Sequence, residues 1–253
     1  MKKVEDSAVN NKYIMKNLLA CFILGILLIP LISHGQAVPA EYFASPADRD
    51  ALLEKLVALP CGIDATDSKS NILDKIGLYL DGYTPNEHYA DDEPARASVR
   101  WALKGVQEGG YGIGAVIAHQ QEGLLHGAYN AQLQRGRSDL HGEMNLLNQF
   151  EDDPAYGKYL NQRAFTGGEG TFYDSALVVV SSAEPCPMCF VRLSISGVAT
   201  KYVTPGPDDG MTERVDCLPP FWAALAKQNT LARADASPVL QKLAHVLFFS
   251  YLL

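Results

Sequence analysis

The sequence predicts a layered α/β fold. From residue 93 onward, short apolar runs typical of buried strands alternate with longer stretches of helical periodicity. The clearest strand signals are GIGAVIA at 112–118 and ALVVVSS at 176–182, which are short and rich in small and β-branched residues. Strands that alternate with helices in this way are typical of a sheet whose faces are covered by helices.

Each element of this region is predicted from a local signal. The first helix ends at a Gly-Gly pair, a short polar turn separates the first two strands, and the strand at 176–182 runs directly into a cysteine motif. The expected elements are a helix at 93–108, strands at 112–118 and 123–129, a helix at 141–150, a strand at 176–182, a helix at 186–196, a strand at 198–204, and helices at 222–227 and 239–249.

The region before residue 93 is expected to form an N-terminal helical extension and a linker. Apolar residues recur at helical spacing in 46–59, where Ser45 is a candidate N-cap, and again at 72–80. The segment 81–94 is rich in Asp, Glu, Asn and Pro and is interpreted as a linker. The sequence therefore predicts three parts, which are residues 1–37, the extension at 38–92 and the α/β domain at 93–253.

The beginning of the chain has the pattern of an export signal. An uncharged run of 15 residues at 18–32 follows two lysines; it is short for a membrane-spanning helix and suits the core of a signal peptide. We therefore interpret residues 1–37 as a signal peptide and expect an exported protein, in a bacterial periplasm or secreted. Met15 would itself begin a normal signal, so 1–14 is a candidate mis-assigned extension. An uncleaved anchor is the alternative, and no stable membrane insertion is expected after cleavage.

The charge of the chain disfavours nucleic acid as a partner. The formal net charge is −8 over 253 residues, and removal of residues 1–36, which hold four lysines and two acidic residues, would change it to −10. Nucleic-acid binding usually relies on a basic surface, whereas this sequence shows only small clusters such as the one at 135–137. A small neutral partner fits this composition better.

Two motifs carry the chemistry of the sequence. His141 and Glu143 belong to HGE, and Cys186 and Cys189 belong to PCPMC. Zinc prefers tetrahedral nitrogen and sulfur ligands, and a catalytic zinc site keeps one position open for water. Two cysteines at i and i+3 lie on one face of a helical turn, so both sulfurs can reach one ion. We therefore predict a Zn²⁺ site formed by His141, Cys186 and Cys189. Glu143 is not one of the ligands, so its carboxylate is free to transfer protons.

This set of residues predicts zinc-assisted hydrolytic deamination. Zinc lowers the pKa of bound water to about 7, which gives hydroxide near neutral pH. Glu143 would take the water proton, hydroxide would attack the ring carbon that bears an exocyclic amine, and Glu143 would then pass protons to the ring nitrogen and the departing ammonia. A redox pair or a structural zinc site is the alternative for the two cysteines. A structural site fits less well because no fourth Cys or His stands near either motif.

Four segments resemble the cytidine deaminase-like superfamily, in the branch that contains guanine deaminases, cytosine deaminases and tRNA adenosine deaminases. The resemblance covers roughly residues 94–215 and implies a three-layer α/β/α fold with a mixed central sheet. It also implies a zinc-dependent hydrolase of the cyclic amidine deaminase type. The segments are GIGAVI at 112–117, GAYN at 127–130, HGEMN at 141–145 and EPCPMC at 184–189.

The resemblance implies the same three ligands and the same proton shuttle, and it adds candidate substrate contacts. Asn130 would hydrogen-bond the base, and the amide of Gly142 could reach a ring carbonyl. Ser181 and Ser182 stand at a strand end expected to face the site, and Ser182 is taken as the substrate contact. The alternative is that Asn130 is an ordinary turn residue and that these serines are ordinary polar residues at the end of a strand.

Two departures limit what the resemblance implies about the substrate. Gly142 replaces the usual alanine, a change expected to loosen the helix start and to leave the chemistry intact. The separation of His141 and Cys186 is longer than is typical of the family, and the extra length falls in 151–173, which is rich in Gly, Asp and Tyr. This insertion is expected to form a lid or rim beside the pocket, or a plain surface loop.

These observations favour a deaminase of a free nucleobase or nucleoside, guanine-like or cytosine-like. The alternatives are a deaminase that acts on adenosine or cytidine in nucleic acid, and a secreted deaminase-fold toxin or scaffold. The expected partner is a small-molecule base or nucleoside, and a homo-oligomer is compatible with the resemblance. Of the five cysteines, Cys21 lies in the expected signal peptide, and two others are the predicted zinc ligands. Cys61 and Cys217 remain, and in an oxidising compartment we predict a disulfide between them. Two separate buried thiols are the alternative.

Overall fold

The computed structural model describes residues 46–161, 171–205 and 231–253, together with Pro220, Ala223 and Ala224. The signal peptide expected at 1–37 and most of the helix expected at 222–227 lie outside these residues. No helix in the described part of the chain combines the length and the apolar character needed to cross a membrane.

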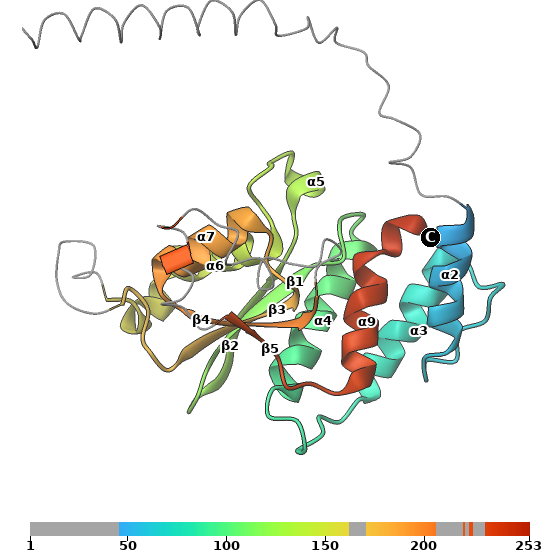
Figure 1. Ribbon diagram of the computed structural model, residues 1–253, viewed down its shortest axis with the longest axis horizontal. Helices are drawn as coiled ribbons and strands as arrows, with labels where there is room; N and C mark the ends of the chain where they lie inside the picture. Colours follow the sequence, from blue (N-terminus) through green and yellow to red (C-terminus); the bar gives the residue numbers. More distant parts are fainter. Residues whose placement is uncertain (1–45, 162–170, 206–219, 221–222, 225–230) are drawn as a thin grey trace, which may run out of the picture. The chain divides into compact units, whose positions relative to one another are not determined.

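A five-stranded mixed sheet forms the centre of the structure (Figure 1). Its strands are β1 (Gly114–His119), β2 (Gly123–Tyr129), β3 (Leu177–Ala183), β4 (Ala199–Thr204) and β5 (Leu231–Arg233). They lie in the order β2-β1-β3-β4-β5, with β1 antiparallel to both neighbours and β4 parallel to both of its own. The mixed sheet expected from the sequence is confirmed. The short strand β5 was not expected, because three residues carry too little periodicity to be recognised.

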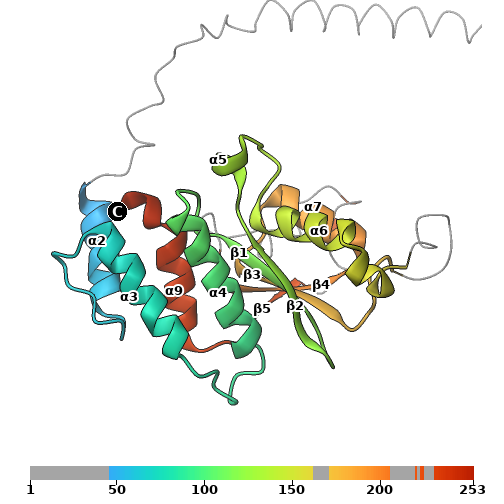
Figure 2. The same cartoon turned by 180° about the vertical axis from the view of Figure 1, so that it is seen from behind.

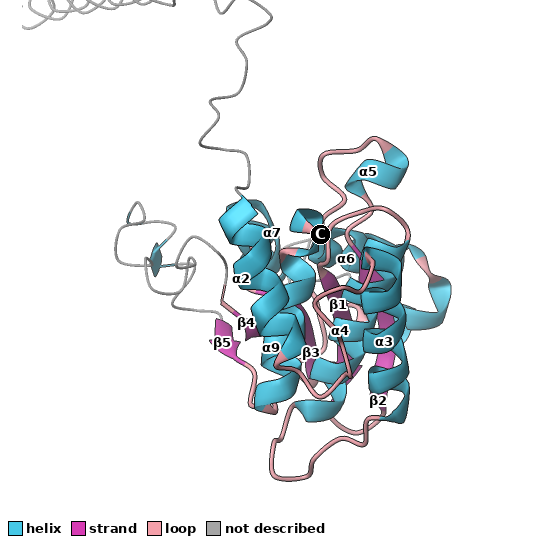
Figure 3. Ribbon diagram, turned by 90° about the vertical axis from the view of Figure 1, so that its right-hand side faces the viewer, coloured by secondary structure: helices cyan, strands magenta, loops and turns pink. Residues whose placement is uncertain are grey.

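Helices cover both faces of the sheet and confirm the three-layer α/β/α arrangement. The helices are α2 (Pro46–Val57), α3 (Lys69–Gly82), α4 (Asp92–Gln107), α5 (Gln132–Arg135), α6 (Gly142–Asp152), α7 (Pro187–Ser196) and α9 (Pro238–Phe248), with 3-10 turns η2 (Pro154–Tyr159) and η5 (Ser250–Leu252). α6 and α7 lie on one face, and α4 and α9 lie on the other (Figures 1 and 2). α3 packs on α4 and α2 packs on α9, so the N-terminal helices form an outer layer (Figure 3).

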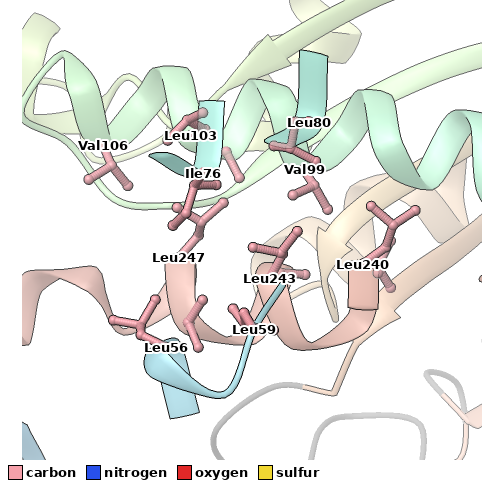
Figure 4. Packing of buried hydrophobic residues seen from close by; sticks show 14 of the residues in the cluster. Leu56, Leu59, Ile76, Leu80, Val99, Leu103, Val106, Leu240, Leu243 and Leu247 are labelled. Carbon is pink, nitrogen blue, oxygen red and sulfur yellow. The ribbon is translucent and has the colours of Figure 1, made fainter. Parts of the chain in front are cut away.

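The N-terminal helices share one hydrophobic core with α4 and α9 (Figure 4). Full burial of a leucine or isoleucine side chain stabilises a fold by about 1.5–3 kcal/mol. Residues from both sides of position 92 therefore stabilise each other. By their internal contacts, residues Ser45–Leu253 form one compact unit. The buried residues of this core include Leu56, Leu59, Ile76, Leu80, Val99, Leu103, Val106, Leu243 and Leu247.

Close packing of β1 against α4 depends on a glycine. A Cβ at Gly114 would lie 2.3 Å from the amide nitrogen of Ala102 and 2.4 Å from the carbonyl oxygen of Ser98, so no other residue fits without a backbone shift. On β2, a Cβ at Gly127 would lie 1.9 Å from Nε1 of Trp101. These contacts fix β1 beneath α4. Because β1 also pairs with β3, they help to place the strand that leads into the cysteine motif.

A buried carboxylate joins the start of α4 to the start of α9. Asp92 is 1% exposed, and it accepts hydrogen bonds from the amides of Asn86 (2.8 Å) and Ser237 (2.7 Å) and from the hydroxyl of Tyr83 (2.6 Å). The C-terminal end of the segment 81–94, expected to be a linker, is therefore held by the hydrogen bonds of Asp92. α4 also begins within this segment.

Asp92→Asn is expected to lower the free energy of unfolding by about 2–4 kcal/mol near pH 7, because an amide group would face buried donors. Burial raises the pKa of Asp92, but the three hydrogen bonds outweigh it and hold the pKa below its ordinary value. The stability that depends on the ionised carboxylate is thus present above an unfolded pKa of about 4 and is lost as the pH falls through the folded pKa.

Urea unfolding of the wild type and of Asp92→Asn measures this difference at neutral and at acidic pH. The difference in the free energy of unfolding between the two proteins should become smaller below about pH 4. A gap of the same size at both values would contradict a role for the ionised carboxylate.

Candidate metal centre

The candidate metal ligands lie at the starts of two neighbouring helices. His141 precedes α6 in extended backbone (φ −62°, ψ 161°), and Cys186 precedes α7 in the same way (φ −65°, ψ 168°). Cys189 lies in the first turn of α7. The two helices pack on the same face of the sheet (Figure 2). The partial positive charge at the start of a helix favours thiolates, which metal binding requires.

The three donor atoms are close enough to bind one ion. Sγ of Cys186 lies 3.4 Å from Nδ1 of His141 and 3.6 Å from Sγ of Cys189, and all three atoms lie within 4.8 Å of one another. A tetrahedral zinc ion with bonds of about 2.3 Å to sulfur and about 2.1 Å to nitrogen separates such atoms by roughly 3.6–3.8 Å. The spacing therefore fits zinc, the cofactor expected from the sequence.

Hydrogen bonding distributes the protons of this centre unequally. The contact with Cys189, together with the contact with His141, lowers the pKa of Cys186 to about 4, so Cys186 is a thiolate at neutral pH. The contact with Cys186 raises the pKa of Cys189, and burial raises it further. A cation bound here would meet one thiolate already formed and would stabilise the second.

Glu143 lies beside the centre and outside the group of three donors. It is 3% exposed in the first turn of α6, and the hydroxyl of Ser181 on β3 donates a hydrogen bond to its Oε1 at 2.9 Å. Burial raises the pKa of Glu143 above the ordinary value. A carboxyl group with a raised pKa can keep a proton that an ordinary carboxyl group would lose, which suits a group that takes up and delivers protons.

Gly142 packs tightly against the residue that precedes β1. A Cβ at Gly142 would lie 3.2 Å from the carbonyl oxygen of Ile113 and 3.3 Å from its Cγ2. The alanine usual in the resembled family would therefore require Ile113 to give way by a few tenths of an ångström. Glycine suits this packing, and the contact of the Gly142 amide with a substrate stays a prediction.

The other two expected substrate contacts are buried and bonded within the protein. Oδ1 of Asn130 accepts a hydrogen bond from the amide of Gln132 (3.1 Å), and its Nδ2 donates to Oε1 of the same residue (2.9 Å). Oγ of Ser182 accepts from the amide of Gly114 at 3.0 Å. Successive strand residues point to opposite faces, so Ser181 is the serine that faces α6. Roles for Asn130 and Ser182 in substrate binding stay predictions.

Two contacts that the sequence analysis did not identify hold α6 in place. Nδ2 of Asn145 donates to the carbonyl oxygen of Tyr129 at the end of β2 (2.9 Å). Near the other end of α6, Arg192 of α7 donates to both carboxylate oxygens of Glu151 at 2.7 and 2.6 Å. Asn145 belongs to the HGEMN segment and could have been singled out there. Arg192 gives no local signal, because its partner lies 41 positions away.

The described part of the insertion at 151–173 extends the core at the C-terminal end of α6. Phe150 stacks on Tyr156 with ring centroids 4.4 Å apart, and Tyr173 is 1% exposed. α6 has 11 residues and is about 16 Å long, so these rings lie at the end of the helix away from the metal centre. Residues 162–170 lie outside the described part, and a lid or rim formed by them stays a prediction.

The predicted disulfide falls partly outside the described residues. Cys61 is half-buried against the core of the N-terminal helices, and burial raises the pKa of its thiol to about 11. Cys217 lies outside the described residues, so the pairing stays a prediction.

Residues 90–204 match the family described as the cytidine and deoxycytidylate deaminase zinc-binding region. This range contains the three donors and Glu143. Fold and site together define a zinc-dependent hydrolase of the deaminase class. The matched range is a little under half of the chain, and the match agrees with the resemblance seen in the sequence.

Several solved structures are similar to this one. A guanine deaminase from Nitrosomonas europaea is 18% identical with a TM-score of 0.47, over 69% of this chain and 91% of that one. A tRNA:A34 deaminase is 16% identical with a TM-score of 0.39, over 54% of this chain and 93% of that one. A guanine deaminase from Bacillus subtilis is 20% identical with a TM-score of 0.34, over 48% of this chain and 67% of that one. No curated protein matches the chain.

Cys189→Ser is expected to abolish zinc binding, because a hydroxyl is a poor replacement for a thiolate in a three-ligand site. Metal analysis of the purified proteins should find about one zinc per chain in the wild type and almost none in this variant. Cys61→Ser is the matched control, since Cys61 lies outside the donor group, and it should keep its zinc. Full zinc occupancy in Cys189→Ser would show that the metal lies elsewhere.

Proposed function

We propose that this chain catalyses the zinc-dependent hydrolytic deamination of a free nucleobase or nucleoside, guanine-like or cytosine-like, with release of ammonia. The observation that carries the proposal is the buried Glu143 beside the converging donors of His141, Cys186 and Cys189. Among the described residues, no fourth metal-binding side chain joins these three. Three protein ligands leave a position for water, as catalytic zinc sites require.

In the proposed reaction, the protein supplies proton transfer. Zinc, when bound, lowers the pKa of a water molecule to about 7. The carboxylate of Glu143 would take a proton from that water and deliver protons to the ring nitrogen and to the leaving amine. The hydroxyl of Ser181 donates a hydrogen bond to Oε1 and so helps to orient the carboxyl group for these transfers. Because burial raises the pKa of Glu143, the proton can stay on the carboxyl group between the two transfers.

Charge and motif support the substrate class. A formal net charge of −8 favours a small neutral substrate over a nucleic acid. In the resembled family, the asparagine at the position of Asn130 contacts the base. This resemblance, together with the EPCPMC segment, favours a guanine-like base over a cytosine-like one. Both polar atoms of the Asn130 side chain bond Gln132 in this structure, so a base bound by Asn130 would displace the Gln132 side chain.

We also propose that the protein is exported, to a bacterial periplasm or out of the cell. The uncharged run at 18–32 supports this, and it lies outside the described residues. N-terminal sequencing of the protein recovered from cell fractions tests it: a mature chain that starts near residue 37 in an extracytoplasmic fraction is the expected result.

Glu143→Gln is expected to keep its zinc and to lose about 10²–10⁴-fold in turnover, because it removes the proton shuttle. Ammonia release is measured for guanine, cytosine, adenine, cytidine and adenosine. Glu54→Gln, which changes an exposed carboxylate on α2, is the matched control and should keep its turnover. If zinc-loaded wild type releases no ammonia from any of these compounds, the proposal is wrong.

Ser181→Ala is expected to lower kcat by about tenfold or more with zinc content unchanged, since it removes a hydrogen bond that orients a charged group. Ser98→Ala is the matched control, because Ser98 is also a fully buried serine and its hydroxyl donates to the carbonyl oxygen of Ala95 within α4. This change should lower the melting temperature and leave kcat unchanged. Steady-state kinetics and thermal unfolding separate the two effects, and an unchanged kcat in Ser181→Ala would contradict its action on Glu143.

A further inference from the structure

A cavity of about 420 Å³ lies between α2, α9 and the edge of the sheet where β4 and β5 pair. None of the three candidate metal ligands lines it. α9 lies on the face of the sheet opposite to α6 and α7 (Figures 1 and 2), so the cavity is distinct from the metal centre.

The polar side chains of this cavity are mainly basic. Lys55 comes from α2, Arg233 from β5, and Lys242 and His245 from α9. No acidic residue is among the described residues that line the cavity. This concentration of basic groups occurs in a chain whose formal net charge is −8, so it is not a consequence of overall composition.

The basic groups of the cavity have no acidic partners in the described part of the chain. Nine ion pairs form there, and none of them includes Lys55, Arg233, Lys242 or His245. Arg233 donates to the neutral amide oxygen of Gln241 at 2.6 Å, which leaves the guanidinium charge uncompensated. Positive charges gathered without anions attract an anionic ligand.

Lys55 and His245 show the effect of this surplus charge. Nζ of Lys55 lies 3.2 Å from Nε2 of His245, an arrangement in which the ammonium donates to a neutral imidazole. Burial lowers the pKa of His245, and the charge of Lys55 lowers it further. The ammonium group of Lys55 therefore donates to a neutral acceptor. An anion in the cavity would accept a stronger hydrogen bond from the same group.

Apart from Thr204 and Gln241, the other described residues that line the cavity are apolar. Ala58, Pro238 and Val246 line it, together with the methylene stems of the basic side chains. A ligand that matches both parts has an anionic group at one end and an apolar body at the other.

We propose that this cavity binds the phosphoryl group of a small phosphate monoester whose apolar body rests against Pro238 and Val246. Three separate elements direct cationic groups into the cavity, and the terminal oxygens of a phosphate dianion can accept hydrogen bonds from several of them at once. A carboxylate has one charge and two oxygens, so it satisfies fewer donors.

Phenyl phosphate, inorganic phosphate and benzoate are the probes, each titrated into the full zinc-loaded chain by calorimetry at low ionic strength. Phenyl phosphate should bind most tightly, and inorganic phosphate more weakly because it lacks the apolar body. Benzoate should bind at least about tenfold more weakly than phenyl phosphate, because it loses charge-assisted hydrogen bonds. Equal binding of benzoate and phenyl phosphate would overturn the assignment of a phosphoryl group, and no binding of phenyl phosphate would overturn the site.

Arg233→Gln and Lys242→Gln locate the binding. Both side chains are exposed, so folding should be retained, and circular dichroism checks this. Each change should weaken phenyl phosphate binding by about tenfold or more. Lys158→Gln removes one charge on η2, away from the cavity, and should leave binding unchanged. An equal loss in all three variants would overturn the proposal, because binding would then follow net charge. Deaminase activity enters none of these measurements, so the result is independent of the proposed function.

Discussion

The structure depends on the spacing of two helix starts. The donors of His141 and Cys186 are 45 positions apart in the chain, yet together with the donor of Cys189 they lie within 4.8 Å of one another. α6 and α7 are therefore held together at two places. The metal centre joins them at their starts, and Glu151 and Arg192 join them further along. The ion pair is partly exposed, so it contributes little to overall stability and acts mainly by fixing the position of one helix against the other.

The sheet extends this constraint to the rest of the molecule. β1 lies between β2 and β3, and it can lie close beneath α4 because Gly114 has no side chain. β2 then presents the carbonyl of Tyr129 to Asn145, while β3 presents Ser181 to Glu143. Small residues at the backbone contacts thus help to determine where the carboxyl group of Glu143 lies relative to the metal donors.

The sequence allowed prediction of features that depend on local signals. The motif spacing identified the three donors and Glu143, and four of the five strands were placed within about two residues. The face to which each strand residue points could not be predicted, because ALVVVSS is buried on both sides and shows no alternation. The structure turns Ser181 toward Glu143, and the predicted contact of Ser182 with a substrate stays a prediction.

Interactions between distant residues account for the other differences. The acidic segment at 81–94 has the composition of a linker, and only the fold reveals that Asp92 accepts a hydrogen bond from an amide 145 positions away. The same reasoning applies to Arg192 and Glu151. In each case the residue type is visible in the sequence but its partner is not, because burial and pairing are properties of the assembled layers.

The core that the outer helices share with α4 limits how residues 90–204 can be transferred to another protein. The outer surface of α4 is covered by α3 and α9, which both lie outside residues 90–204. A fragment cut at those limits would expose Val99, Leu103 and Val106 as a continuous apolar patch, a common cause of aggregation. The unit that can be moved to another protein therefore includes the flanking helices, and the segment that carries the chemistry is shorter than the segment that folds.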